Sequence, residues 1–228
     1  DRSPSRGLGD VYKRQTHTYI MKFNFIFDTE TTGLPKSRGF GNFYDYTDSA
    51  KYDSSRLVQI AWLICDDTGD VKVERTHIIC PDGFTIPEES TKIHNISDAH
   101  AREIGVKFDK VVEHLVHDLK EYAPKRMVAH NLQFDRHVLL AELHRRGGNE
   151  DLLKHLLGMG KNCTMLTGKP LCNITTPKNP NWVKFPSLVE LHEYLFHKPM
   201  EAKHEALYDT RMCAKCFVEL RKVLKKKR

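Results

Sequence analysis

The stretch that decides the fold is FIFDTETTGLP, residues 25–35. Three apolar residues lead directly into Asp28, and a second acid, Glu30, follows two residues later. On a strand, residues i and i+2 point to the same face, so both carboxylates would share one face. Two acids placed in this way repel each other where water is scarce, unless a cation lies between them. The stretch therefore indicates either a divalent-metal site at the end of a buried strand or a strand that has reached solvent with two ordinary acids.

Similar acids stand at the ends of other predicted elements. VAHNLQFD, residues 128–135, runs from a short apolar strand through a polar turn to Asp135 at a helix start. HEALYDT, residues 204–210, places His204 and Asp209 at the opening of the last long helix. An Asp in a first helical turn is common without any further function. Four acids and one histidine at such positions nevertheless favour a site for Mg²⁺ or Mn²⁺, which prefer carboxylate oxygens.

Hydrophobic periodicity predicts an α/β fold with a mixed sheet. Ser97 has the signature of an N-cap residue for a short helix. The segment 35–56 is long for a connection between two strands, so we expect a functional loop or a mobile insertion there. The remaining elements are expected as strands at 22–28, 56–67, 70–80 and 126–130, and as helices at 107–122, 134–148, 186–196 and 204–225.

Length and composition favour one intracellular domain. The chain has 228 residues, of which 39% are hydrophobic, which is enough for one substantial core. No apolar run approaches the ~20 residues that a membrane span needs, and no secretory signal is evident. Six scattered cysteines without such a signal favour reduced thiols over a disulfide framework. We therefore expect a cytoplasmic protein that does not associate with a membrane.

The two ends differ from the rest of the chain. The string from Ser5 to Gln15 resembles the in-frame translation of a sequencing-library adapter, so residues 1–15 are predicted to be a non-native tail. The natural start would then be Met21 or somewhat upstream. Six bases in residues 221–228 supply much of the formal net charge of +6. A basic tail of this kind suits either a phosphate contact or a solvated helix end. The predicted organisation is a tail at 1–15, one domain at 16–220 and a basic tail at 221–228.

Taken together, FDTETTGLP, HNLQFD and HEALYD resemble the three motifs of the DEDD superfamily of 3′→5′ exonucleases, also called DnaQ-like. The resemblance covers about residues 22–222. One subgroup of this family has Tyr four residues before the last acid, where this chain has Glu205. The other has His five residues before it, where this chain has His204. The chain is thus similar to the histidine subgroup, DEDDh, which implies a ribonuclease H-like fold with a mixed sheet of about five strands flanked by helices.

The resemblance also implies a two-metal mechanism. Asp28, Glu30 and Asp209 would hold one Mg²⁺ or Mn²⁺ ion. Asp28 would bridge to a second ion, which Asp135 would support directly or through water. His204 would take the proton from the attacking water, because an imidazole exchanges protons near neutral pH. The expected product is a nucleoside 5′-monophosphate released from the 3′ end.

The family motifs further imply contacts to the terminal nucleotide. Gly33 would allow a close approach of the substrate, and Leu34 would wedge beside the terminal base. Ile96, in a segment that resembles the family's His-x-Ile, would pack on a base. Core packing explains Leu34, Ile96 and Phe134 as well. The full set of predicted substrate-binding residues is Thr29, Thr31, Gly33, Leu34, Ile96, Asn131 and Phe134.

Several alternatives stay open at this point. The substrate is expected to be nucleic acid with a free 3′ end, with DNA at single-stranded or frayed ends favoured, in proofreading or repair. An exoribonuclease that trims RNA or short oligonucleotides is the alternative within the class, because contacts to the 2′-OH cannot be read from the sequence. A catalytically silent module that binds 3′ ends is a different alternative, and the intact set of acids argues against it. A polymerase partner and a homodimer are both compatible with the sequence.

Overall fold

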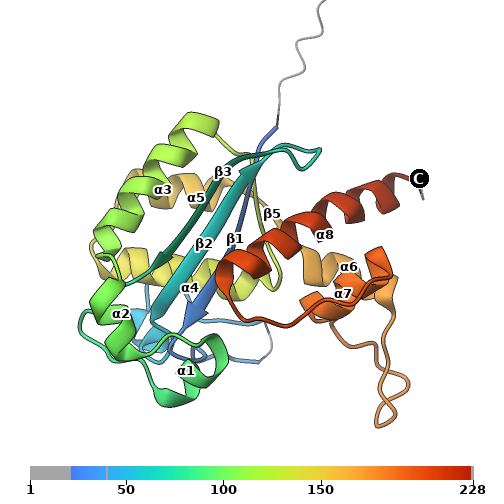
Figure 1. Cartoon of the computed structure of the whole chain (residues 1–228), viewed down its shortest axis with the longest axis horizontal. Helices are drawn as coiled ribbons and strands as arrows, with labels where there is room; N and C mark the ends of the chain where they lie inside the picture. Colours follow the sequence, from blue (N-terminus) through green and yellow to red (C-terminus); the bar gives the residue numbers. More distant parts are fainter. Residues whose placement is uncertain (1–21, 40, 227–228) are drawn as a thin grey trace, which may run out of the picture.

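The structure is a computed structural model of the chain and describes residues 22–39 and 41–226. Five strands form one mixed sheet in the order β3-β2-β1-β4-β5. Helices cover both faces of this sheet (Figure 1). The predicted α/β class and the sheet of about five strands are both confirmed. The strands are β1 (Asn24–Thr31), β2 (Leu57–Cys65), β3 (Val71–Ile78), β4 (Arg126–Ala129) and β5 (Gly160–Cys163).

Strand direction brings the first two acidic motifs to one edge of the sheet. β1 runs antiparallel to β2, which runs antiparallel to β3. β4 runs parallel to β1 and to β5. The carboxyl ends of β1 and β4 therefore meet at the same edge, where ligands bind in many sheets of this kind. The acids of β1 and the turn after β4 come together for this reason.

Eight α-helices and one short 3₁₀ helix belong to the described residues. Ser97 caps α2 through a side chain that accepts a hydrogen bond from the His100 amide, as the sequence predicts. The helices are α1 (Glu88–His94), α2 (Asp98–Ile104), α3 (Phe108–Tyr122), α4 (Leu132–Arg145), α5 (Glu150–Gly158), α6 (Thr164–Cys172), α7 (Leu188–Phe196) and α8 (Ala206–Lys226), with η1 at Ser49–Tyr52.

The alternation of side chains along β1 decides which layer each residue meets. Phe25 and Phe27 face the main core, which the sheet forms with α3, α4 and α5. Ile26 faces the other way and packs against Cys213 and Phe217 of α8. By the same alternation, Asp28 and Glu30 face the α8 layer and Thr29 faces the α4 layer. The sheet is thus the middle of three layers, and the site forms where β1 leaves the core.

The differences from the predicted elements concern the length of β1 and several short elements, most of them after α4. β1 continues to Thr31, so Asp28 and Glu30 lie within the strand and not beyond its end. Five elements were not predicted, namely η1, α1, α5, β5 and α6. β5 has the sequence GKNC and carries no alternating apolar pattern. Its strand conformation comes from pairing with β4, which is a tertiary contact that a local pattern does not reveal.

The long connection between β1 and β2 is packed against the domain. Tyr52 is fully buried and donates a hydrogen bond to the Tyr44 carbonyl at 2.5 Å. The ring of Phe43 lies 6.3 Å from that of Phe134 on α4. These contacts hold Phe43, Tyr44 and Tyr52 against the domain, and a function of the segment 35–56 stays a prediction.

At the ends of the chain, the predicted tail 1–15 lies outside the described residues. The predicted basic tail 221–228 begins inside α8, which continues to Lys226. Arg221 bonds to both carboxylate oxygens of Asp67. Residues 221–226 are therefore a continuation of the last helix.

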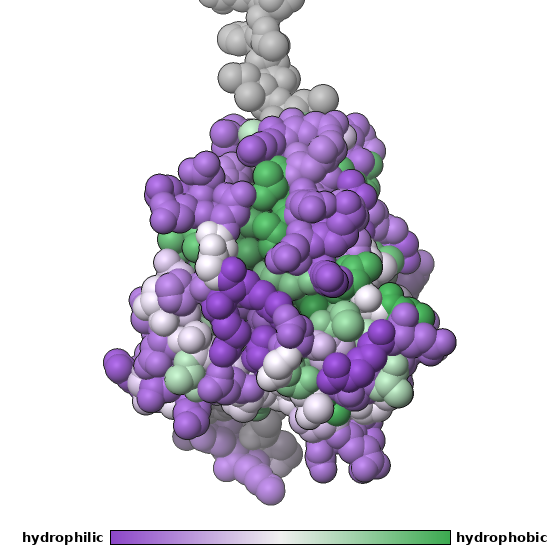
Figure 2. Space-filling model, turned by 90° about the vertical axis from the view of Figure 1, so that its left-hand side faces the viewer, coloured by the Kyte–Doolittle hydropathy of each residue, from purple (hydrophilic) through white to green (hydrophobic). Residues whose placement is uncertain are grey.

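The surface is mostly hydrophilic on the face shown in Figure 2, and the cysteines are not paired in disulfides. The face formed by the helices on the left of Figure 1 is mostly hydrophilic, and its apolar surface shows in furrows between hydrophilic ridges (Figure 2). Within residues 22–39 and 41–226, no helix combines the length and the apolar character needed to cross a membrane. All six cysteines are free thiols, as predicted.

Candidate active site

Three carboxylates from two layers meet at the end of β1. Asp28 and Glu30 point from the strand toward α8, and Asp209 comes from the first turn of that helix. One oxygen of each carboxylate lies within 4.8 Å of the others. In the sequence, Asp209 follows Asp28 by 181 residues and Glu30 by 179. The cluster therefore exists only because α8 packs on β1.

The start of α8 is held in place by two hydrogen-bonding groups. Gln59 lies opposite Glu30 in the β1–β2 register, and its buried Oε1 accepts a hydrogen bond from the Ala206 amide at 3.1 Å. The carboxylate of Glu205 accepts bonds from the amides of Leu207 and Tyr208. Glu205 thus satisfies free amides of the first turn, as an N-cap side chain does. The sequence analysis missed both roles. Gln59 belongs to no motif, and Glu205 lies within HEALYD but was considered only as the residue at the position where the other subgroup has Tyr.

Asp135 reaches the site from the opposite layer. It lies in the first turn of α4 and is 2% exposed. Its Oδ1 accepts hydrogen bonds from both the amide and the hydroxyl of Thr29, at 3.1 and 2.8 Å. Among the described residues, the group of three close carboxylates does not include Asp135. Thr29 therefore orients Asp135 beside the cluster, and its hydroxyl is used by this contact.

Burial and mutual repulsion make the carboxylates difficult to ionise. The pKa of Glu30 is raised to about 8 by burial and by the nearby Asp209 and Asp135. Burial and then the neighbouring acids raise the pKa of Asp28 well above its usual range. The pKa of Asp209 is raised to about 6 by burial, against the lowering effect of His204. Burial also raises the pKa of Asp135. A cation among these groups would reverse the unfavourable electrostatics.

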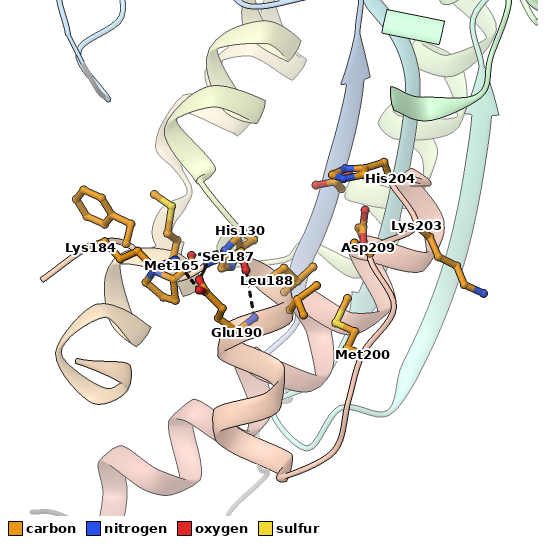
Figure 3. Close-up of a pocket in the computed structure, with 15 residues that line it drawn as sticks. His130, Met165, Lys184, Ser187, Leu188, Glu190, Met200, Lys203, His204 and Asp209 are labelled. Carbon is orange, nitrogen blue, oxygen red and sulfur yellow. Dashed lines mark hydrogen bonds and ion pairs between the residues drawn. The ribbon is translucent and has the colours of Figure 1, made fainter. Parts of the chain in front are cut away.

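His204 lies in the segment just before α8 and is exposed. Its backbone φ of 47° is in the left-handed region, which non-glycine residues adopt at some cost. Figure 3 shows His204 and Asp209 beside each other at one end of a hollow. An exposed imidazole next to the carboxylates is in reach of solvent, as a proton acceptor must be.

The donor set fits a hard divalent cation. Mg²⁺ and Mn²⁺ take carboxylate oxygens and water, and three converging carboxylates with raised pKa values provide such ligands. Asp28, Glu30 and Asp209 would hold the ion. The arrangement lacks the His and Cys ligands of a typical structural zinc site.

The residues of the β1 end have distinct environments. The Thr31 hydroxyl donates to the Gly33 carbonyl at 2.7 Å. Gly33 has a φ of 152°, and a Cβ there would lie 2.9 Å from the Ser54 carbonyl oxygen. The close approach that requires glycine is thus made by the β1–β2 connection. Leu34 is 77% exposed, which leaves its side chain free to contact a ligand.

The other predicted substrate contacts divide between the core and a small hollow. Ile96 is 5% exposed and packs with Val58 and Ile86 in a side cluster, so core packing explains it in this structure. Asn131 and Phe134 line a hollow of about 180 Å³ together with Leu34. Contact with the terminal base therefore stays a prediction for Leu34, Asn131 and Phe134. The Thr29 hydroxyl bonds to Asp135, and Ile96 packs in the side cluster.

A second hollow was not predicted from the sequence. It opens from Asp28, Asp209 and His204 toward α6 and α7 and has a volume of about 520 Å³ (Figure 3). Apart from Asp28, His130, His204 and Asp209, its lining comes from segments that no motif marks, so no signal in the sequence pointed to this hollow. The wall residues include Met165, Phe185, Pro186, Leu188 and Met200.

Comparisons with known proteins identify a family and a fold for the chain. Residues 25–217 match the exonuclease family RNase_T. A search of curated protein sequences finds no match to the chain. Escherichia coli exonuclease I in complex with a dT13 oligonucleotide superposes with a TM-score of 0.67 at 14% identity, over 90% of this chain and 42% of that one. Exonuclease I with a 5cy-dT13 oligonucleotide gives 0.65 at 16% identity, over 91% and 42%.

A third solved structure is closer to this chain in length. The Mg²⁺- and Mn²⁺-bound form of S. pombe Pop2p superposes with a TM-score of 0.63 at 17% identity, over 87% of this chain and 82% of that one. At these identities the likeness concerns the fold, and the chain spans less than half the length of exonuclease I. The family match covers most of the chain and includes the strand and helix that carry the three carboxylates. The chain therefore belongs to the RNase_T exonuclease family of DnaQ-like, ribonuclease H-fold nucleases.

Proposed function

We propose that this protein is a divalent-metal-dependent 3′→5′ exonuclease that removes nucleoside 5′-monophosphates from the 3′ end of a nucleic acid strand, with DNA as the favoured substrate. The observation that carries the proposal is the convergence of Asp28, Glu30 and Asp209 within 4.8 Å, from both sides of the β1–α8 contact. Asp135 and His204 complete the set that the family motifs imply.

The chemistry assigns one task to each group. Bound Mg²⁺ or Mn²⁺ would polarise the phosphate and make water a better nucleophile, and two such ions are expected by the family resemblance. Asp28, Glu30 and Asp209 would hold the cation, and Asp135, oriented by Thr29, would support the site. His204 would accept the proton of the attacking water. The new P–O bond forms as the bond to the 3′ oxygen breaks, and the shortened strand keeps a 3′-OH.

The terminal nucleotide has a suitable place beside the carboxylates. Leu34, Asn131 and Phe134 line the small hollow at the carboxyl ends of β1 and β4. An exposed leucine and an aromatic ring provide apolar faces for a base, which any base can use. We expect a free 3′-OH to be accommodated better than a blocked 3′ end.

The experiment is a cleavage assay with 5′-labelled single-stranded DNA, duplex DNA and RNA in Mg²⁺. Each substrate is offered with a free 3′-OH and with a 3′-phosphate, and a circular single strand is included. We expect a ladder of shortened products from free ends, with 5′-monophosphates released. Efficient cutting of the circle would make the protein an endonuclease and contradict the proposal.

The same assay separates the alternatives for the substrate. Faster trimming of RNA than of DNA would show that RNA is the favoured substrate, and the protein would still be a 3′→5′ exonuclease. Binding of 3′ ends without any cleavage, in Mg²⁺ and in Mn²⁺, would show a silent binding module. Proofreading for a polymerase and dimer formation stay predictions that this assay does not address.

A further inference from the structure

One long segment of the chain contains no acidic residue. From Leu152 to Val189 it has five lysines and neither aspartate nor glutamate, whereas 30 acids in 228 residues would place about five acids in a stretch of this length. The segment comprises most of α5, all of β5 and α6, and the connection from α6 to α7. A region of one charge in a chain of otherwise mixed charge is typical of a surface that contacts a polyanion.

The connection from α6 to α7, residues 173–187, forms an arm that projects from the molecule (Figure 1). The Lys184 amide donates to the Ile174 carbonyl at 2.8 Å and closes the base of the arm. At its tip, the Asn179 amide donates to the Thr176 carbonyl at 3.0 Å. Connections between packed helices usually have roughly 2–8 residues, and long loops are often functional. The arm is therefore the candidate contact element within the acid-free segment.

The arm presents an exposed tryptophan whose ring is held in position. Trp182 is 48% exposed. The Nζ of Lys169, on α6, lies 5.4 Å from the centroid of the indole ring, and the ring of Phe185 meets it in a T-shaped arrangement at 6.4 Å. These contacts orient the indole and leave much of the residue open to solvent. Such a ring can stack on an unpaired base without regard to sequence, because every base has a π face.

Two lysines supply positive charge to this region. Lys169 lies against the indole ring, and Lys178 is exposed near the tip of the arm. Neither forms an ion pair with any residue that the structure describes. Lys184 at the base differs, because its ammonium group pairs with Glu190. Unpaired lysines near an exposed aromatic ring are the combination that binds single-stranded nucleic acid, through the phosphates and through base stacking.

The base of the arm lies at the end of the larger hollow that is remote from the carboxylates. Lys184 and Phe185 line this hollow, and Asp209 and His204 lie at its other end (Figure 3). A strand whose 3′ end is held at the carboxylates can therefore continue toward the arm with its 5′ part. Trp182 does not line the hollow, so its contact lies beyond the nucleosides at the cleaved bond.

We propose that the arm, residues 173–187, binds a single-stranded part of the substrate on the 5′ side of the cleaved bond, outside the site of cleavage. One unpaired base stacks on Trp182, and Lys178 contacts a phosphate. The inference rests on the proposed exonuclease function and adds a second contact surface to it. It implies that long single strands bind more tightly than dinucleotides, because only long strands reach the arm.

The test compares two substrates with free 3′-OH ends in Mg²⁺, a single strand of about 20 nucleotides and a dinucleotide. Trp182→Ala should raise KM for the long strand about tenfold, as loss of one stacked base does, with kcat unchanged. The kinetics of dinucleotide cleavage should not change, because a dinucleotide does not reach the arm. Trp182→Phe keeps an aromatic face and should stay within about threefold of the wild type.

Lys178→Ala tests the phosphate contact. For the long strand, the slope of log(kcat/KM) against log[salt] should become less steep by about 0.7, the value for one phosphate of a single strand. Two matched controls lie outside the acid-free segment. Lys120 is an exposed lysine on α3, and Tyr194 is an aromatic residue of 41% exposure on α7. Lys120→Ala and Tyr194→Ala should behave as the wild type does on both substrates.

Fluorescence provides a test that does not depend on cleavage. The chain has two tryptophans, and the other one, Trp62, is fully buried. Titration of the wild-type protein in EDTA with the long strand should quench the emission of Trp182, and Trp182→Phe should show no such quenching. Lys178→Ala should need more strand for half-maximal quenching.

The outcomes separate the inference from the proposed function. Wild-type kinetics on the long strand in Trp182→Ala, or no quenching in the wild type, overturns the inference and leaves the exonuclease intact. An equal loss on the dinucleotide also overturns it, because the arm would then shape the site of cleavage. If Trp182→Ala does not fold, the quenching experiment decides. If no substrate is cleaved in Mg²⁺ or Mn²⁺ but quenching occurs, the proposed function fails and the contact of the arm with nucleic acid stands.

Discussion

At the level of single residues, the site is a group of carboxylic acids. Burial and the neighbouring acids make each of them harder to ionise. Asp28 and Glu30 share one face of β1, and Asp209 faces them from α8. The pKa of Glu30 is raised to about 8 by burial and by neighbouring acids, which is unfavourable for a metal-free protein at neutral pH. Folding therefore prepares a site that a cation would stabilise, and the exposed His204, for which we propose the role of base, lies beside it.

Replacing His204 should separate the rate from metal binding. As a proton acceptor and not a ligand, it is expected to affect kcat, so His204→Ala should lower kcat by roughly 10²–10⁴ with metal affinity nearly unchanged. Asp28→Asn should weaken both, because it removes a charge from the centre of the cluster. Cleavage at saturating metal and calorimetric titration with Mn²⁺ measure the two effects.

A matched control for this comparison is available. His197 is also exposed and also has a left-handed backbone, with φ 53°, but it ends α7 outside the site. His197→Ala should leave kcat unchanged. If His204→Ala loses metal as severely as Asp28→Asn does, then His204 is a ligand and the assigned division of roles is wrong.

The raised pKa of Glu30 predicts how the stability of the metal-free protein depends on pH. The folded-state pKa of about 8 lies above the usual value of about 4.3 in an unfolded chain. Between these values the unfolded state releases the proton first, so the free energy of unfolding falls as pH rises from about 5 to 8. The melting temperature in EDTA should decrease across this window, and Mg²⁺ should raise it more at pH 8 than at pH 5.

Glu30→Gln provides the comparison for that measurement. The amide cannot ionise, so the melting temperature of this variant in EDTA should depend less on pH between about 5 and 8. It should also gain less from Mg²⁺, because one ligand charge is lost. An identical pH dependence in the variant and the wild type would contradict the role assigned to Glu30.

At the level of elements, the site depends on how α8 begins against β2. The Ala206 amide at the start of this helix donates to Gln59 Oε1 on β2, and one turn later the Thr210 hydroxyl donates to the Ala61 carbonyl on the same strand. The same helix turn carries Asp209, and His204 immediately precedes it. A buried glutamine far from the chemistry in sequence therefore positions two groups of the site.

Gln59→Met should lower activity because it removes the hydrogen bond that holds the start of α8. Methionine has a similar shape but accepts no hydrogen bond of comparable strength, so the buried Ala206 amide would be left unsatisfied at a cost of about 1–3 kcal/mol. We expect a lower melting temperature and a reduced kcat. Gln133→Met is the control, because Gln133 is exposed on α4. Unchanged kcat in a folded Gln59→Met protein would show that the helix start does not need this bond.

At the level of the whole molecule, the end of α8 is tied to the sheet. Arg221 and Arg126 both bond to Asp67, and Arg126 also bonds to Asn24 on β1. Hydrogen bonds from both arginines hold the pKa of Asp67 well below its usual range, against the effect of burial. The network connects α8, β1, β4 and the β2–β3 turn at the end of the sheet opposite the site.

A chain that ends at residue 220 should therefore be less stable than the full chain. It follows the predicted domain boundary but loses Arg221, whereas a chain that ends at residue 224 keeps this residue and serves as the control. Because the folded-state pKa of Asp67 is lowered, the stabilisation is present above its unfolded value of about 3.9 and is lost as pH falls below it. The difference in melting temperature between the two chains should be clear at pH 7 and should shrink in acid. Equal melting temperatures at pH 7 would show that the folded domain does not need residues beyond 220, in agreement with the predicted boundary.

The sequence by itself determined the class of fold and the acids of the site. Apolar strands that end in acids, and helices that begin with them, are local patterns, and the spacing of His204 to Asp209 separates two subgroups of a family. These features are visible because each depends on neighbours within a few residues. Strand β1, helices α3 and α4 and the capping role of Ser97 were predictable for the same reason.

Only the tertiary structure decided which groups meet. Thr29 orients Asp135 across 106 residues, and Gln59 holds Ala206 across 147. β5 is a strand because β4 pairs with it, although its sequence has no strand pattern. The hollow beside the carboxylates is assembled from walls such as Met165 and Met200, which no motif marks. Long-range pairing and packing depend on residues that are distant in the chain, and therefore no local pattern contains them.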